Sequence, residues 1–369
     1  MANERVPLQK GKVVDNAVSV FVGGKAFNGW EQVTITKSIE SIAYSFKIDL
    51  FDKFTGLSQD WPLRPGLEAK VRIGKETVIT GRIESLDVSY SDEERGSYSV
   101  SGRSKAGDLV DCMWTGDNEY QNISLTKFAK TLTAPFGIQV FESVVPSNID
   151  KVSVKPGETI FEVLNRQARL QGLLFISTRE GNIRLTRAAR ARASSSLEQG
   201  VNILDASATY DNSERHNRYI VKGQSKGTDE FFGANVSEPE GEATDNGITR
   251  HRPLVIIADG NVDDKIAKTR AQWEASSRLA RAIRVNVAVQ GWAQASGDLW
   301  DINQIIAFKS SFLGVNRKFL ISEVTHSLGK DEGKTTSLVL VDPQSYDPQP
   351  VVNKDPAEDD IISQLKATR

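Results

Sequence analysis

The sequence predicts a mainly β protein in which two similar β-domains enclose a small α+β insert. Three observations predict it. Apolar residues alternate with polar ones up to about residue 103 and again near the C-terminal end, and the segment between them shows patterns of both helices and strands. In addition, the hairpin-like stretch that begins at residue 82 resembles the one that begins at residue 320. The 369 residues suffice for two or three domains. We expect a first β-domain over 1–103 and an α+β insert over 104–196. A second β-domain is expected in two pieces, 197–225 and 284–342. Between these pieces we expect an acidic excursion with a helix over 226–283, and after them a tail over 343–369.

The first β-domain is predicted from runs of period two. A half-buried strand is indicated by the alternation of Ile42, Tyr44, Phe46, Ile48 and Leu50 with polar or small residues. Shorter runs cover 18–22, which ends at a Gly-Gly turn, and 67–73. A hairpin with a charged, Gly-containing loop at 91–97 is predicted from Leu86, Val88 and Tyr90 on one side and Tyr98 and Val100 on the other.

The insert is predicted to hold two units of a helix followed by strand. Ser124 can cap a helix that Pro135 and Gly137 end before a short strand. Thr159 and Glu162 have the spacing of a capping box for the second helix, which Gly172 ends. The insert is therefore expected to be one small α+β domain.

Strands are predicted to resume after residue 197, and two features then interrupt them. The stretch 225–260 is polar, Gly-rich and acidic, so we expect an exposed excursion rather than core. A helix over 262–283 carries an i, i+4 stripe that favours close packing on a helix or a sheet: Ala267, Ala271, Ala275, Leu279 and Ile283. Its basic residues, which include Arg278 and Arg281, fit either a solvated face with a Glu274–Arg278 pair or a surface for an acidic partner or DNA.

Two hairpin-like stretches align with each other. Residues 82–90 align with 320–328, which sets Leu86, Val88 and Tyr90 against Val324, His326 and Leu328. Both copies then enter a loop containing Asp-Glu and leave it onto an alternating strand, and upstream 67–73 aligns less well with 302–308. The likeness fits either a duplicated β-domain or the general similarity of amphipathic hairpins.

Composition excludes several classes of function. Lys plus Arg is 46 against 48 for Asp plus Glu, a net charge of −2, so no global positive field holds a polyanion. The single cysteine, Cys112, excludes an intrachain disulfide, and we expect it to be a small buried residue. The three histidines lie too far apart in sequence for an HExxH face. No secretion signal or membrane anchor is predicted.

No catalytic centre is predicted either. Motifs for a nucleophile elbow, a P-loop or a dinucleotide fingerprint are absent from the sequence. Two of the many acidic residues could meet in a cleft, as in a polysaccharide hydrolase, but solvated surface acids are the expected interpretation. His326 occupies an apolar phase of its strand, which indicates a neutral core or interface histidine rather than a base. We therefore predict no enzyme, no cofactor and no metal, and a function that depends on surfaces.

The stretch 18–52 resembles the opening of the baseplate hub proteins of bacteriophage Mu and its prophage relatives. The shared features are a Gly-Gly turn, a Gly-Trp, a Ser-Ile-Glu segment and an aromatic-rich strand, in this order: Gly23-Gly24, Gly29-Trp30, Ser38-Ile39-Glu40, and Tyr44 with Phe46. Residues 102–112, 156–172 and 217–224 resemble the end of that family's first β-domain, its middle-domain helix and the entry to its second β-domain. The resemblance therefore runs over nearly the whole chain.

The resemblance implies two β-barrel-like tube domains per chain and a homotrimeric ring in a contractile tail's baseplate. Three chains would present six similar units, and this would adapt a threefold central spike to a sixfold tail tube and leave a channel for DNA. Such a channel should not grip the DNA that passes through it, in keeping with the near-neutral charge. The expected location is the virion, after assembly in the bacterial host cytoplasm.

The partners implied are a second and third copy of the chain, the spike, the tube or tube-initiator protein and other baseplate proteins. The interface residues expected are Trp273, Arg278, Arg281 and His326. Because few residues follow Leu340, the spike and any cell-wall hydrolase are expected on separate chains. The alternatives are a β-rich cell-wall or polysaccharide hydrolase and a receptor-binding tail protein. The sequence does not reveal the source phage, the role of 225–260 or any bound ion.

Overall fold

A computed structural model describes residues 17–53, 63–90, 95–189, 191–224, 239–261, 264–330 and 332–347. The chain divides into two compact units, each described here by itself. Unit 1 comprises 1–168, 173–208 and 285–341, and unit 2 comprises 169–172, 209–284 and 342–369. Across the described ranges, no helix is long and apolar enough to span a membrane.

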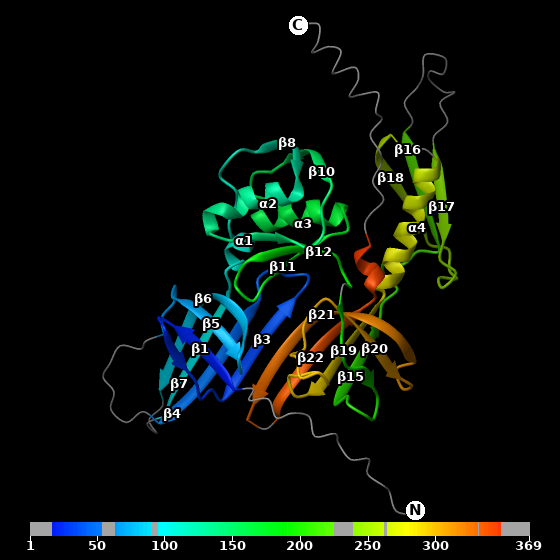
Figure 1. Ribbon diagram of the computed structural model, residues 1–369. Coiled ribbons are helices and arrows are strands. Elements are labelled where there is room, and N and C mark those ends of the chain that lie inside the picture. Colours follow the sequence, from blue (N-terminus) through cyan, green and yellow to red (C-terminus); the bar gives the residue numbers. More distant parts are fainter. Residues whose placement is uncertain are drawn as a thin grey trace, which may run out of the picture. The chain divides into compact units, whose positions relative to one another are not determined.

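The first β-domain of unit 1 is built from seven strands in the order β3-β4-β7-β6-β5-β1-β2 (Figure 1). The predicted alternation is confirmed for 42–48, since Ile42, Tyr44, Phe46 and Ile48 are all buried. The strand itself begins only at Ser45, and the side chain of Leu50 lies outside the described part. The predicted hairpin is also confirmed, because β6 and β7 pair antiparallel. The strands are β1 (Val18–Val22), β2 (Lys25–Phe27), β3 (Gln32–Ser38), β4 (Ser45–Lys53), β5 (Glu68–Ile73), β6 (Glu76–Tyr90) and β7 (Arg95–Ser104).

The insert has the expected helix-and-strand character and one continuous core. Both predicted caps form, because the Lys127 amide donates to Ser124 Oγ at 3.2 Å and the Glu162 amide donates to Thr159 Oγ1 at 3.3 Å. One face of each helix joins the same core, with Phe128 and Leu164 fully buried. Its elements are α1 (Gly107–Asp111), β8 (Glu119–Ser124), α2 (Leu125–Thr133), η1 (Ala134–Phe136), β9 (Val140–Glu142), β10 (Asn148–Ser153), α3 (Ile160–Leu170), β11 (Leu174–Ser177) and β12 (Ile183–Thr186).

The second β-domain has the strand order β15-β19-β22-β21, and β20 pairs with β21. Two short strands, β13 and β14, run parallel to β20. Val285, Val287 and Val289 of β19 are buried, so the alternating pattern again marks the core face. The strands are β13 (Ala191–Arg192), β14 (Leu197–Glu198), β15 (Asp205–Tyr210), β19 (Ile283–Gln290), β20 (Gln304–Ser310), β21 (Val315–Gly329) and β22 (Gly333–Val341).

The two β-domains repeat one strand order. Taken in chain order, the strands β3, β4, β5, β6 and β7 correspond to β15, β19, β20, β21 and β22, and each set is arranged first-second-fifth-fourth-third. The long strands also carry a β-bulge at aligned positions, between Ile83 and Ser85 in β6 and between Ile321 and Glu323 in β21. The predicted alignment of 82–90 with 320–328 is therefore confirmed, and chance likeness of two hairpins does not account for it.

The upstream part of that alignment is wrong by two residues. Glu68 lies opposite Arg82, whereas Ile305 lies opposite Leu320, the counterpart of Arg82. Residues 67–73 therefore correspond to 304–310 and not to 302–308. A slip of two residues keeps every side chain on the same face of the sheet, so the apolar pattern could not reveal it.

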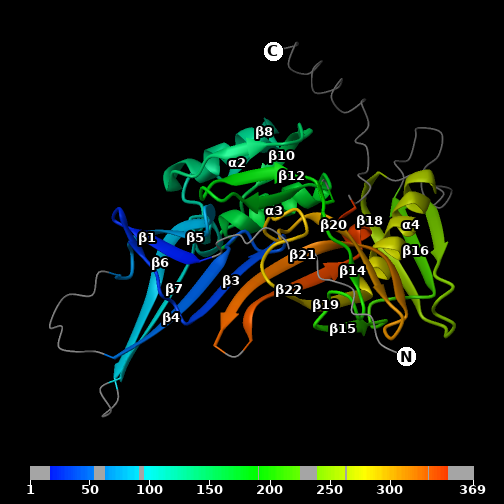
Figure 2. The same ribbon diagram turned by 60° about the horizontal axis from the view of Figure 1, so that its bottom comes forward.

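A direct strand pairing joins the two β-domains into one sheet. β3 pairs antiparallel with β21, with Val33 opposite Leu328 and Lys37 opposite Val324. Figure 2 shows the two strands side by side. The sheet path runs on from β15 to β2 without a break, and among the described strands its two ends do not meet to close a barrel.

Unit 2 holds a three-stranded sheet in the order β17-β16-β18 and a helix packed on it. The structure corrects two expectations here, because 218–224 was expected in the second β-domain and 225–260 was expected as an exposed excursion. Instead, β16 pairs with β17 and β18, and residues 225–238 lie outside the described part. The elements are β16 (Arg218–Gln224), β17 (Glu240–Thr244), β18 (Pro253–Asn261), α4 (Asp264–Arg281) and η3 (Pro343–Tyr346).

The predicted helix stripe is only half right. Ala267 and Ala271 are fully buried against Tyr219 and Val221, but Leu279 is exposed and Ile283 belongs to β19. A row of i, i+4 positions drifts round a helix of 3.6 residues per turn, so the buried row continues instead through Glu274, Ser277 and Ala280. The helix approaches β17 closely, since a side chain at Gly241 would collide with the backbone of Ala267 and Lys268.

We expect Gly102→Ala to destabilise the fold by about 2 kcal/mol, because the added methyl overpacks a filled site. Gly102 lies opposite the β6 bulge, where a Cβ would collide with the Arg82 carbonyl oxygen and sit 2.7 Å from the Phe46 ring. Urea unfolding measures the change. The control is Gly137→Ala, whose added methyl would meet no neighbour within 4 Å. Because Gly137 has a φ of +64°, this substitution should cost only backbone strain, which is smaller than the cost of the collision at Gly102. Equal losses in both variants would contradict the packing explanation.

Candidate functional site

The candidate site is a network of charges where three segments of unit 1 meet. Lys37 comes from the end of β3, Arg179 from the turn between β11 and β12, and Asp301 from the loop before β20. Lys37 sits in the buried phase of its strand, so its side chain is only 4% exposed. A lysine in such a place needs a carboxylate close by.

Asp301 is that carboxylate, and it stands at the centre of the network. Its Oδ1 accepts from Lys37 Nζ at 3.1 Å and from the Ile302 amide at 2.9 Å, and its Oδ2 lies 3.5 Å from Arg179 Nη2. Burial alone would raise the pKa of Asp301, but the charges of Lys37 and Arg179 outweigh it and hold the pKa below its ordinary value. Asp301 is therefore ionised and fixed in orientation.

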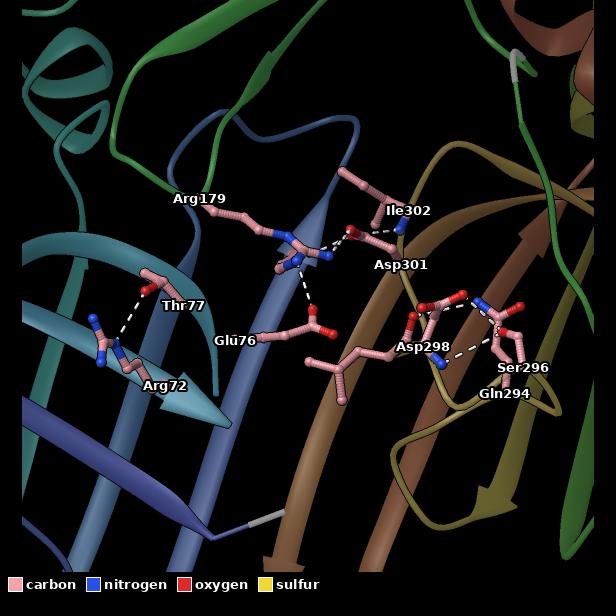
Figure 3. A network of polar contacts seen from close by, with 11 residues as sticks. Arg72, Glu76, Thr77, Arg179, Gln294, Ser296, Asp298, Asp301 and Ile302 are labelled. Atoms are coloured by element: carbon pink, nitrogen blue, oxygen red, sulfur yellow. Dashed lines mark hydrogen bonds and ion pairs between the residues drawn. The ribbon is translucent and has the colours of Figure 1, made fainter. Parts of the chain in front are cut away.

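Arg179 links the insert to both β-domains. Figure 3 shows its guanidinium between Glu76 and Asp301, with Nη1 donating to Glu76 Oε2 at 2.6 Å. Its backbone carbonyl accepts from Thr80 Oγ1 at 2.7 Å. Burial alone would lower the pKa of Arg179. The carboxylates of Asp301 and Glu76 raise it by more than burial lowers it, so the net shift of the pKa is upward.

A polar recess of about 200 Å³ opens beside these charges. Tyr44 lines it and is buried, and burial together with the negative charge of Asp301 raises the pKa of its phenol well above the ordinary value. Lining residues also include Glu180 and Arg184. Among the charged residues that line the recess, Lys37 and Arg179 are both paired with Asp301.

His326 was expected at an interface, and the structure places it in the core of the second β-domain, the other position that its apolar phase indicated. Its side chain has no exposed surface, and its Nδ1 is 3.3 Å from Thr336 Oγ1. Burial and then the positive charge of Lys37 lower its pKa to about 3. The histidine is therefore neutral at pH 7, and it is not available at the protomer surface for a partner.

The other three predicted interface residues lie on α4 in unit 2. Trp273 donates from Nε1 to the Asp347 carbonyl at 3.1 Å, and the Arg270 guanidinium stacks 5.0 Å from its ring. Arg278 pairs with Glu274 at 3.2 Å, as predicted, and with Glu214 at 3.0 Å. The side chain of Arg281 is exposed at the end of the helix.

Sequence reasoning missed the network itself. Lys37 follows Val33 and Ile35 in the buried phase of β3, and this charged residue in an apolar phase is the signal that could have drawn attention. Its partner is 264 residues away, where no local pattern marks it. Cys112 also differs from expectation, because it is only half-buried.

The arrangement is suited to holding segments of the chain together. In the part of the chain that the structure describes, no group of three or more His, Cys, Asp and Glu side chains could hold a metal ion. Asp301 accepts a hydrogen bond from Lys37, and Glu76 accepts one from Arg179, so both carboxylates of the network are held by a cation from another segment. The network thus ties β3, β6, the insert and the loop before β20 to one another.

We expect Asp301→Asn to lower the free energy of unfolding by about 3 kcal/mol, because it leaves the buried Lys37 without a carboxylate. Lys37→Met should lower it by less, because Asp301 keeps the guanidinium of Arg179. The double variant should lose clearly less than the sum, by about 1–3 kcal/mol of coupling. Urea denaturation of all four proteins measures this. The exposed Lys309–Glu198 pair, at 2.7 Å, supplies the control, and Lys309→Met should leave the unfolding midpoint unchanged. Strict additivity of Lys37→Met and Asp301→Asn would show that the two side chains do not interact.

The stability of the chain should fall as the pH is lowered from 6.5 towards 3. His326 has an ordinary pKa of 6.5 but about 3 when folded, so the unfolded chain binds more protons throughout this window. At pH 4.5 the loss attributable to His326 is about 3 kcal/mol relative to pH 7. Urea unfolding of wild type and His326→Gln at both pH values measures it. The variant should lose less stability between pH 7 and 4.5, and an equal loss in both proteins would refute the assignment.

Comparison with known protein families accounts for most of the chain. Residues 17–104 match the family described as "Mu phage baseplate assembly protein GpP-like, N-terminal", and residues 106–187 match "Baseplate hub protein gp44-like, second domain". Residues 263–349 match "Mu phage baseplate assembly protein GpP, fourth domain". The baseplate hub protein gp44 of Escherichia phage Mu is 31% identical over 347 residues, which are 90% of this chain and 89% of gp44.

Solved structures agree with this relationship. The 43 kDa tail protein of prophage MuSo2 from Shewanella oneidensis is 30% identical, with a TM-score of 0.79 over 90% of this chain and 100% of its own. A tail protein from Neisseria meningitidis is 23% identical, with a TM-score of 0.75 over 90% and 98% of the two chains, and shows the shared fold. The sequence resemblance is thus confirmed, and the chain belongs to the baseplate hub family of Mu-like phages.

Proposed function

We propose that the chain forms a homotrimeric ring at the centre of a contractile tail's baseplate. The ring adapts a threefold central spike to a sixfold tail tube and leaves a channel through which DNA passes without specific binding. Its further partners are the tube or tube-initiator protein and other baseplate proteins. Its location is the virion, after assembly in the host cytoplasm.

The observation that carries this proposal is the repeated strand order of the two β-domains. Each chain contains two copies of the same five-strand arrangement, including the bulge at aligned positions. Three chains around a threefold axis would therefore present six similar units to a sixfold partner. The charge network supports the same role, because it fixes the first β-domain, the insert and the second β-domain to one another within a protomer.

We further propose that the protein acts without catalysis and that its domains follow the expected division, with 218–224 reassigned to the α4 unit. The repeat supports the two β-domains, and the paired state of the network carboxylates supports a mechanical role. On α4, Trp273, Arg278 and Arg281 remain the residues that we propose for contact with other subunits. Arg281 has the most favourable position of the three, because its side chain is exposed.

The mass of the purified chain in solution tests the proposal, together with its binding to a spike protein and a tail-tube protein of the same phage or prophage. A trimer at micromolar concentration that binds either partner is expected. A monomer that binds neither would refute the hub function. Clearing of cell walls by the isolated chain would favour the hydrolase instead, and direct binding to host cells would favour a receptor-binding protein.

A further inference from the structure

Three places in the sequence combine an asparagine with a small following residue. They are two Asn-Gly pairs and one Asn-Ser pair: Asn28-Gly29, Asn246-Gly247 and Asn212-Ser213. Asparagine is thermolabile in such pairs, because the backbone nitrogen of the following residue can attack the carbonyl carbon of its side chain. The attack requires a backbone amide that is free to lose its proton and a side chain that is free to turn. We therefore compare the surroundings of the three pairs.

The first pair is exposed and has no hydrogen-bond partner. Asn28 and Gly29 lie in the link between β2 and β3, outside any helix, strand or turn. Among the described residues, neither the Gly29 amide nor the Asn28 side chain takes part in a hydrogen bond. Both reacting groups are therefore available.

The backbone at Gly29 keeps this pair open to attack. Gly29 has a φ of +88°, a conformation in which any other residue would be strained. A Cβ at this position would meet no atom within 4 Å, so open space surrounds the bond between the two residues. The side chain of Asn28 thus has room to turn towards the Gly29 nitrogen, and the residue that the backbone requires is the one that shields this nitrogen least.

The second Asn-Gly pair is held by a carboxylate. The Gly247 amide donates to Asp245 Oδ1 at 2.9 Å, and Asp245 is itself fixed by Arg215, whose Nε donates to Oδ2 at 2.8 Å. A Cβ at Gly247 would collide with the guanidinium of Arg215, so the space beside this amide is filled. The carboxylate keeps the amide proton in place, and attack on Asn246 would have to break that hydrogen bond.

The Asn-Ser pair is held at both reacting groups. The Ser213 amide donates to Asp211 Oδ1 at 2.7 Å, and the Asn212 side-chain carbonyl accepts from Arg215 Nη1 at 2.8 Å. In the part of the chain that the structure describes, Asn28-Gly29 is thus the one pair of the three whose attacking amide has no partner.

We propose that Asn28 is a site of spontaneous covalent modification, at which the side-chain amide is lost. The Gly29 nitrogen gives up its proton and bonds to Cγ of Asn28, the Cγ–Nδ2 bond breaks, and ammonia leaves with one proton gained. Water then opens the resulting cyclic imide at either of its carbonyl groups and leaves an aspartyl or an isoaspartyl residue at position 28. Water is the only co-reactant, and no atom is oxidised or reduced.

The modification changes the charge and the backbone where the chain enters β3. A neutral amide becomes a carboxylate, and the isoaspartyl product also adds a methylene to the main chain. The link is anchored on both sides, because Phe27 pairs with Val20 and the Glu31 amide donates to the Asp49 carbonyl at 3.0 Å. Since neither anchor takes part in the reaction, we expect the modified chain to stay folded.

Peptide mapping by mass spectrometry tests the proposal on folded and on unfolded protein. The full-length chain is incubated at mildly alkaline pH, once in buffer and once in urea, and the conversion at positions 28, 212 and 246 is followed over time. In the folded chain, position 28 should convert at least about tenfold faster than position 246, the factor that breaking one hydrogen bond to a charged acceptor supplies. In urea the two Asn-Gly positions should convert at similar rates, because their local chemistry is then the same.

The matched variant is Asn28→Gln, which keeps a side-chain amide but places its carbonyl carbon one bond further from the Gly29 nitrogen. This variant should lose the acidic species that ion-exchange chromatography separates from incubated wild-type protein. Equal conversion at positions 28 and 246 in the folded chain would overturn the proposal, and so would conversion at position 28 in urea alone. The reaction requires no second chain, so either result leaves the hub function to its own test.

Discussion

The pairing of β3 with β21 is the constraint on which unit 1 depends. It turns two β-domains into one sheet, and it places Lys37 opposite Val324 and Ile35 opposite His326. Lys37 and His326 are consequently buried close to the junction, where one must be paired and the other must stay neutral. Asp301 satisfies the lysine, and the positive charge of that lysine helps to keep the histidine unprotonated.

The insert is fastened to the same junction. Arg179 reaches Glu76 and Asp301, and Ser177 Oγ donates to the Ile42 carbonyl at 2.5 Å. Three segments that are distant in sequence thus share one set of polar contacts. These contacts hold the two β-domains and the insert to one another within a protomer.

Local sequence patterns predicted the elements well and their long-range partners poorly. The caps at Ser124 and Thr159, the strand at 42–50 and the alignment of the two hairpins depend on periodicity and turn chemistry within short windows. The Lys37–Asp301 pair depends on a contact across 264 residues, and the β16–β18 sheet depends on strands on both sides of a polar stretch. Neither leaves a periodic signal, so neither could be predicted from the sequence.

The central claim is that two copies of one β-domain in each chain let three chains form a ring of six similar units. Electron microscopy of the full-length chain at micromolar concentration tests this claim most directly. We predict closed rings with threefold symmetry, in which the two β-domains of each chain supply six similar units. Isolated protomers or open filaments would contradict it.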